Sequence, residues 1–150
     1  MKKNTSRGVA TLPTVLVLGI MTLAVVVGIT SVSLTESFIS QGSAQSSKAL
    51  FYAESGARDA LVKISRNKSY TCSATDCYTI DFSTNGCSLL NDCAKVSVSA
   101  GVGTGGDPKI VTSKGIMKAS ARTIRVSVII DTNGQIATST TETIWTEVIN

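Results

Sequence analysis

Histidine is absent from all 150 residues of the sequence. Histidine is the usual general base near neutral pH and supplies imidazole metal ligands, so its absence excludes Ser-His and Cys-His nucleophile arrangements. No pair of acidic residues has a recognisable catalytic spacing. We therefore predict that the chain is not an enzyme, and we expect no catalytic residue, no metal site and no cofactor.

Charge is absent from a long stretch near the N-terminus. From Val9 to Thr35 the chain has 27 consecutive uncharged residues. A helix of that length would extend about 40 Å, more than the roughly 30 Å hydrocarbon core of a bilayer requires. The stretch is preceded by three basic residues: Lys2, Lys3 and Arg7. Because basic residues favour the cytoplasmic side, we expect residues 9–34 to span a membrane once, with the N-terminus in the cytoplasm.

A cleaved secretory signal peptide is the alternative interpretation of this stretch, with Val15 to Ile29 as its apolar region. The following segment, Thr30 to Thr35, shows no convincing small-x-small cleavage pattern. The uncharged run is also long for a signal peptide. We therefore favour a membrane helix over ordinary signal cleavage.

Proline is scarce, with two in the sequence and none between Thr30 and Ser47. Without a helix breaker, the helix is expected to continue as an amphipathic segment over residues 35–68. Apolar residues recur there at spacings of three and four: Leu50, Ala53, Ala57, Ala60, Leu61 and Ile64. We expect this stripe to pack against the C-terminal half of the chain.

All four cysteines lie within residues 69–93: Cys72, Cys77, Cys87 and Cys93. Their spacing lacks the C-x2-C pairs of common zinc sites, and an extracytoplasmic position favours disulfides. The sequence leaves open a sequential pairing (first with second, third with fourth) and a nested one (first with fourth, second with third). We prefer the sequential pairing, which needs only tight loops, and expect residues 69–93 to form a cysteine-stapled loop with short extended pieces.

Apolar and polar residues alternate in the C-terminal region, as in Ala94 to Val98 and Thr123 to Val128. Turn sequences occur at Gly101 to Asp107 and Asp131 to Gly134. This pattern predicts an antiparallel meander of about four strands over residues 94–150. With the helix packed on this sheet, the expected fold class is α+β.

Three further patterns resemble binding motifs without completing them. The run Gly101–Gly106 is not followed by the Lys-Ser/Thr and helix of a phosphate-binding loop. The acidic residues of the cysteine region, Asp76, Asp81 and Asp92, do not form a calcium-loop pattern. The sheet region also carries five basic residues: Lys109, Lys114, Lys118, Arg122 and Arg125. We expect these to lie on a solvated sheet face and treat nucleic acid as a disfavoured partner.

The segment Arg7-Gly8-Val9-Ala10, followed by the long apolar helix, resembles the N-terminus of type IV pilins and pseudopilins. This resemblance implies that residues 1–8 are a leader, removed between Gly8 and Val9 by a prepilin peptidase that also methylates the new N-terminus. It further implies a head of sheet on helix, and assembly with other pilin subunits through the N-terminal helix.

Internal segments are similar to PilX-like minor pilins. These are Phe51–Ala57 (Phe-Tyr-Ala-Glu-Ser-Gly-Ala), and Ile110–Gly115 with Ala121–Val126, which resemble a strand, a glycine turn and a long strand. One position departs from major pilins, because Pro13 stands at the fifth mature position, where they carry a glutamate that pairs with a neighbouring subunit's N-terminal amine. An acid in hydrocarbon is costly unless paired, and its absence argues for a minor role.

We therefore expect a minor pilin that is made as a prepilin in the inner membrane and assembled into a type IV pilus or pseudopilus at the cell surface. Its role would lie in pilus assembly, adhesion, DNA uptake or secretion. The alternative is an unprocessed, single-pass membrane protein with an extracytoplasmic binding or sensor domain.

Overall fold

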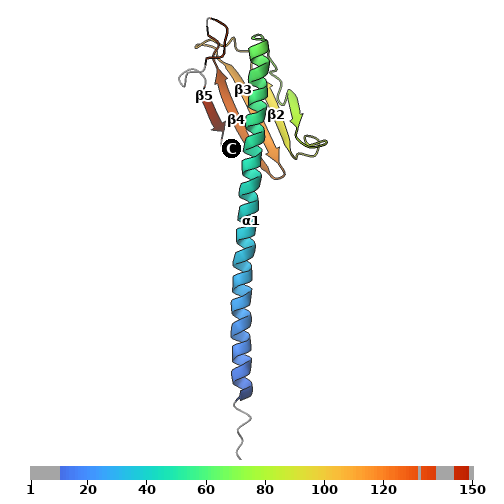
Figure 1. The fold of residues 1–150 in the computed structure, drawn as a ribbon, viewed down its shortest axis with the longest axis vertical. Coiled ribbons are helices and arrows are strands. Elements are labelled where there is room, and N and C mark those ends of the chain that lie inside the picture. The colour runs from blue at the N-terminus through green and yellow to red at the C-terminus, as the bar shows by residue number, and fades with distance from the viewer. Residues whose placement is uncertain (1–10, 132, 138–143, 149–150) are drawn as a thin grey trace, which may run out of the picture. The chain divides into compact units, whose positions relative to one another are not determined.

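One α-helix and five β-strands make up the secondary structure of residues 11–131, 133–137 and 144–148, which the computed structural model describes (Figure 1). The elements are α1 (Thr11–Arg66), β1 (Tyr78–Asp81), β2 (Cys93–Val98), β3 (Lys109–Met117), β4 (Ser120–Val128) and β5 (Ile144–Val148). The chain separates into two units, Met1–Gln41 and Gly42–Asn150, and α1 contributes residues to both.

The second unit is built on one antiparallel sheet with the strand order β1-β2-β3-β4-β5. Each strand pairs with the one before it in the chain, so the sheet is a meander. The predicted α+β layout of a long apolar helix and an antiparallel sheet is confirmed. The sheet has five strands rather than about four, because β1, which lies in the region expected to form a loop with short extended pieces, pairs with β2. The sequence indicates a short extended piece but does not show that it will pair with another strand.

One face of the sheet packs against the second part of α1, which crosses the sheet in Figure 1. The register places Val98, Val111 and Val126 in one row across three strands. These valines and the helix form a single core: Ala53, Ala57, Ala60, Ile64, Val96, Val98, Val111, Ile124, Val126 and Val128. Burial of this apolar surface is the main contribution that holds helix and sheet together.

The helix meets the sheet through small side chains. Four alanines on one side of α1 are 0% exposed: Ala49, Ala53, Ala57 and Ala60. At spacings of three and four these residues share one helix face, and their size lets the helix backbone approach the strands closely. The apolar stripe predicted from the sequence is therefore the face of α1 that is buried against the sheet. Leu50 and Leu61 are partly buried beside it.

Gly115 marks the closest approach of the helix to the sheet. A Cβ at this position would collide with the backbone of Ala49 and Ala53. Gly115 lies within β3, so it does not form the glycine turn that the resemblance to minor pilins implied. Residues 118 and 119 make the turn between β3 and β4 instead.

Gly56 has the corresponding role on the helix. A Cβ there would collide with Oγ of Ser113 in β3 and would lie 2.9 Å from Cγ2 of Val96 in β2. Glycine within a helix costs about 1 kcal/mol relative to alanine in propensity. The absence of a side chain at this position instead allows β2 to pack directly against the helix.

Gly115→Ala should lower the free energy of unfolding of the second unit by about 1–3 kcal/mol, because the added methyl group overpacks a backbone contact. Gly105→Ala is the matched control, since a Cβ at Gly105 would meet no atom within 4 Å. Urea unfolding of the full chain in detergent micelles, followed by the fluorescence of its single tryptophan, Trp145 in β5, measures both variants. Equal effects of the two substitutions would contradict the close contact.

Candidate functional site

The part of α1 in the first unit exposes apolar side chains along its whole length. Every large apolar residue from Leu12 to Ile39 is at least 56% exposed within the described residues. By length and composition, α1 is sufficient to cross a membrane. An apolar surface of this extent requires lipid or other protein to cover it.

Several hydroxyl groups in this segment form hydrogen bonds within the helix itself. Four of them donate to a backbone carbonyl three or four residues earlier, at 2.5–3.0 Å: Thr22, Thr30, Ser31 and Thr35. Side chains bonded in this way need no water. The segment rich in serine and threonine is therefore compatible with lipid or with a bundle of helices.

Two disulfides flank β1 in the second unit. Cys72 is joined to Cys77 and Cys87 to Cys93, with Cα–Cα distances of 5.7 and 4.9 Å. Of the two pairings that the sequence allows, sequential and nested, the structure has the sequential one. Cys72 also exchanges two backbone hydrogen bonds with Val98, at 2.8 and 2.9 Å, and Cys93 begins β2. Both disulfide-closed loops are thus attached to the same strand, β2.

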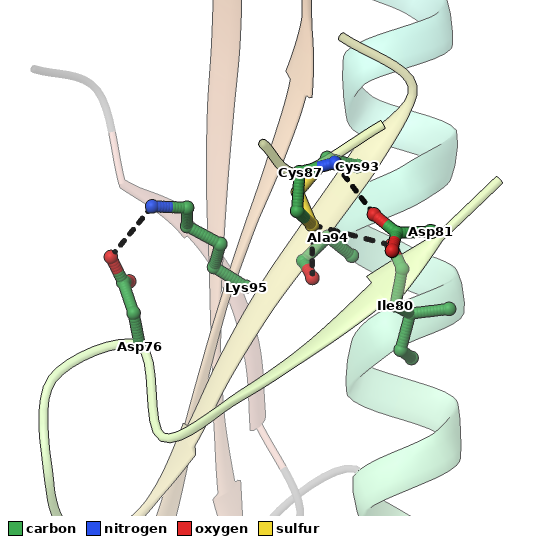
Figure 2. The surroundings of a disulfide bond; sticks show 7 residues. All are labelled: Asp76, Ile80, Asp81, Cys87, Cys93, Ala94 and Lys95. Carbon is green, nitrogen blue, oxygen red and sulfur yellow. Dashed lines mark hydrogen bonds and ion pairs between the residues drawn. A yellow bond between two sulfur atoms is a disulfide. The ribbon is translucent and has the colours of Figure 1, made fainter. Parts of the chain in front are cut away.

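The three aspartates of this region bind donors within the protein. Figure 2 shows Asp81 beside the Cys87–Cys93 disulfide, where it accepts a hydrogen bond from the Cys87 backbone N–H at 2.5 Å. It also shows the ion pair of Asp76 with Lys95, at 3.1 Å. Although Asp81 and the two sulfur atoms lie within 4.8 Å of one another, the sulfurs are bonded to each other and do not offer thiolates.

Tyr52 connects α1 to the loop closed by Cys87 and Cys93. Its hydroxyl donates to the third aspartate, Asp92, at 2.6 Å. Its ring stacks on Phe82 with a centroid distance of 4.4 Å and an interplanar angle of 16°. The hydrogen bond to Asp92, together with burial, raises the pKa of Tyr52 to about 12, because the carboxylate opposes a phenolate beside it.

A second tyrosine attaches β1 to the helix. The ammonium of Lys63 lies 3.3 Å from the ring centroid of Tyr78, in cation–π geometry, and forms an ion pair with Asp59 at 2.9 Å. Burial raises the pKa of Tyr78 above its ordinary value. The disulfide region is therefore held to α1 at two tyrosines.

The predicted set of basic residues does not share one sheet face. Lys109 is 2% exposed and donates to the carbonyl of Tyr70 at 3.2 Å. Arg122 forms an ion pair with Glu147 at 2.9 Å and donates to the hydroxyl of Ser46 on α1 at 2.8 Å. Alternation along the strands places these two residues on the helix side of the sheet.

Lys114 and Arg125 are exposed on the opposite face, and Lys118 lies in the turn after β3. The expectation of one solvated basic face therefore holds for Lys114 and Arg125 alone. Lys109 and Arg122 were misassigned because the sequence does not show which residue of an alternating strand faces the helix when both faces carry polar residues.

Sequence reasoning missed the contacts of Tyr52 and the role of Gly115. The segment Phe51–Ala57 was recognised only as a resemblance, yet it contains Tyr52 together with the buried Ala53 and Gly56. A glycine within a β-branched run such as Ile110–Gly115 signals a close backbone approach as well as a turn. That signal was available in the sequence, whereas the partner of Tyr52 was not.

Tyr52→Phe should lower the free energy of unfolding by about 1–2 kcal/mol at neutral pH, because it removes a hydrogen bond to a carboxylate but keeps the stacked ring. The raised pKa means that this contribution is complete below pH 10 and is lost as the pH rises towards 12. The difference between wild type and variant should therefore shrink across that range.

Urea titrations at several pH values, followed by Trp145 fluorescence, measure this difference. Tyr70→Phe is the control, since the Tyr70 hydroxyl makes no hydrogen bond in the described part of the chain. A difference that stays constant from pH 9 to 12 would contradict the assigned role of Tyr52.

Residues 1–10 lie outside the described part of the chain. They include the predicted processing residues, Gly8 and Val9, and the basic residues Lys2, Lys3 and Arg7. Pro13 lies in α1, and Glu36 is the first acidic residue of the chain. Comparisons with protein-family models, with curated proteins and with solved structures find no match to this chain.

Proposed function

We propose that this chain is a PilX-like minor pilin of a type IV pilus or pseudopilus. In this proposal it is made as a prepilin, inserted once in the inner membrane, cleaved between Gly8 and Val9, and methylated at Val9. Its N-terminal helix then leaves the bilayer and packs against the helices of other subunits. The chain acts through its surface and catalyses no reaction.

The observation that carries this proposal is the continuously exposed apolar surface of α1 from Leu12 to Ile39. Lipid covers such a surface before assembly, and neighbouring helices cover it in a filament. Gly19 and Gly28 leave open space around their Cα atoms, which permits close approach of another helix. Hydroxyls bonded within the helix suit both environments.

The disulfide region supports a location outside the cytoplasm. Both cysteine pairs are oxidised, and disulfides persist in extracytoplasmic compartments. The basic residues Lys2, Lys3 and Arg7 lie on the other side of the apolar stretch, which agrees with an N-terminus in the cytoplasm. In this topology the second unit becomes the extracellular head.

Pro13 supports a minor rather than a major subunit. A glutamate at this position would need a partner in the hydrocarbon or in the filament core, and proline has no charge to pair. A subunit without this pairing has one docking interaction fewer with its neighbour, which suits low abundance or a terminal position in the filament.

N-terminal mass spectrometry of the chain from its native host tests the proposal. Wild type should begin at N-methylated Val9. Gly8→Leu should keep residues 1–8 and be absent from filaments, because the leader then lacks the glycine that lets a protease approach the backbone. Gly19→Leu adds the same side chain in open space and should be processed as in wild type.

Three results would contradict the proposal. An intact Met1 in wild type supports the rival function, an unprocessed membrane-anchored binding or sensor protein. An N-terminus beyond Ser33 indicates ordinary signal cleavage. Unchanged incorporation of the Gly8→Leu chain into filaments shows that processing at this site is not required.

A further inference from the structure

A pocket in the second unit lies between the residues that follow α1 and the start of β3. Its volume is about 300 Å³, and it is lined by Lys68, Ser69, Thr71 and Lys109 and by residues 100–102. This volume is at the lower end of the range for small-molecule sites. Two of the lining side chains are cationic, and two carry hydroxyl groups.

Lys109 is a buried cation without a counter-charge. It is 2% exposed, and its ammonium makes one hydrogen bond in the described residues, to the carbonyl of Tyr70 at 3.2 Å. Among those residues no carboxylate lies within ion-pair distance of it. Buried charges are normally paired, because removing them from water is costly. An ammonium with unused N–H groups at a pocket wall is suited to an anionic ligand.

Three further donors of the pocket are also unused. The ammonium of Lys68 lies against Gly134, and Ser69 and Thr71 are exposed. None of these three side chains makes a hydrogen bond or ion pair within the part of the chain that the structure describes. Two cations beside one pocket repel each other unless an anion lies between them. The pocket therefore offers two positive charges and two hydroxyls to one ligand.

The neighbouring loop carries one carboxylate, that of Asp107, so the charged side chains around the pocket, Lys68, Lys109 and Asp107, keep a net positive charge. The carboxylate of Asp107 accepts a hydrogen bond from the Val102 N–H at 3.1 Å, and the Gly101 N–H donates to the hydroxyl of Ser99 at 3.4 Å. The backbone N–H groups of Gly101 and Val102, which line the pocket, are thus engaged within the loop. An anion here would be held by side chains, in contrast to a phosphate-binding loop, which uses backbone N–H groups.

We propose that this pocket binds the phosphate group of a small ligand. Lys109 and Lys68 balance the charge of a phosphate dianion, while Ser69 and Thr71 donate hydrogen bonds to its oxygens. Two ammonium groups favour a dianion over a singly charged carboxylate. Inorganic phosphate, a soluble sugar phosphate and a lipid headgroup all present such a group, and the experiment below distinguishes them. The proposal does not depend on processing or filament assembly.

Titration of the ¹⁵N-labelled full chain in uncharged detergent micelles tests this site. Inorganic phosphate and glucose 6-phosphate, added at constant ionic strength, should shift the amide signals of Ser69, Thr71 and Gly101 along saturating curves. Lys109→Met should weaken binding about tenfold or more, and Lys68→Met should weaken it by a smaller factor. Lys114→Met makes the same charge change on the opposite sheet face and should leave the affinity unchanged.

The outcomes separate the sources of phosphate and the rival roles of Lys109. Tighter binding of glucose 6-phosphate indicates a soluble phosphoester, whereas saturable shifts on doping the micelles with phosphatidylglycerol indicate a lipid headgroup. Shifts that do not saturate with any probe, an equal response to acetate, or equal weakening by Lys109→Met and Lys114→Met would overturn the proposal. Lys68→Met changes an exposed side chain, so its result remains informative even if Lys109→Met impairs folding.

Discussion

The contact between the backbone of α1 and Gly115 of β3 sets the geometry of the second unit. A side chain at this position would meet the helix backbone at Ala49 and Ala53, so the two elements lie as close as main chains allow. The helix positions that face the sheet must then be small, and they are alanine or glycine: Ala49, Ala53, Gly56, Ala57 and Ala60. Each alanine buries little apolar area, but the short separation brings the sheet valines into dense van der Waals contact with the helix. The core of the second unit depends on this close approach.

The same contact explains which residues of the helix segment Phe51–Ala57 face the sheet. Its small residues face the sheet, while Tyr52 reaches the loop closed by Cys87 and Cys93 through a hydrogen bond and a stacked ring. The segment therefore holds together the three parts of the unit: helix, sheet and disulfide region. Phe51 remains 63% exposed, and its ring lies edge-to-face with that of Tyr52 at a centroid distance of 6.2 Å. Most of what made the segment resemble a family pattern has a structural explanation within this chain.

The sequence predicted the features to which many residues of one kind contribute. The uncharged run, the apolar stripe ending at Ile64 and the alternating C-terminal strands each supply many residues to one pattern, so a single exception does not obscure them. Other features depend on residues that meet only in the folded chain. Tyr52 and Asp92 are 40 positions apart, and Lys109 and Tyr70 are 39 apart. The disulfide pairing belongs to the same class, because spacing permits both arrangements and strand pairing selects one. The pairing of β1 with β2 is a further example, because the sequence indicated a short extended piece but not its partner strand.

The central claim is that one helix serves first as a membrane anchor and then as an assembly element. The most direct test is the mass of the N-terminal peptide of this chain in surface filaments sheared from its native host. The account predicts that the chain co-purifies with the filaments at low abundance and begins at N-methylated Val9. Its absence from the filaments, with the full-length chain beginning at Met1 retained in the membrane fraction, would contradict the account.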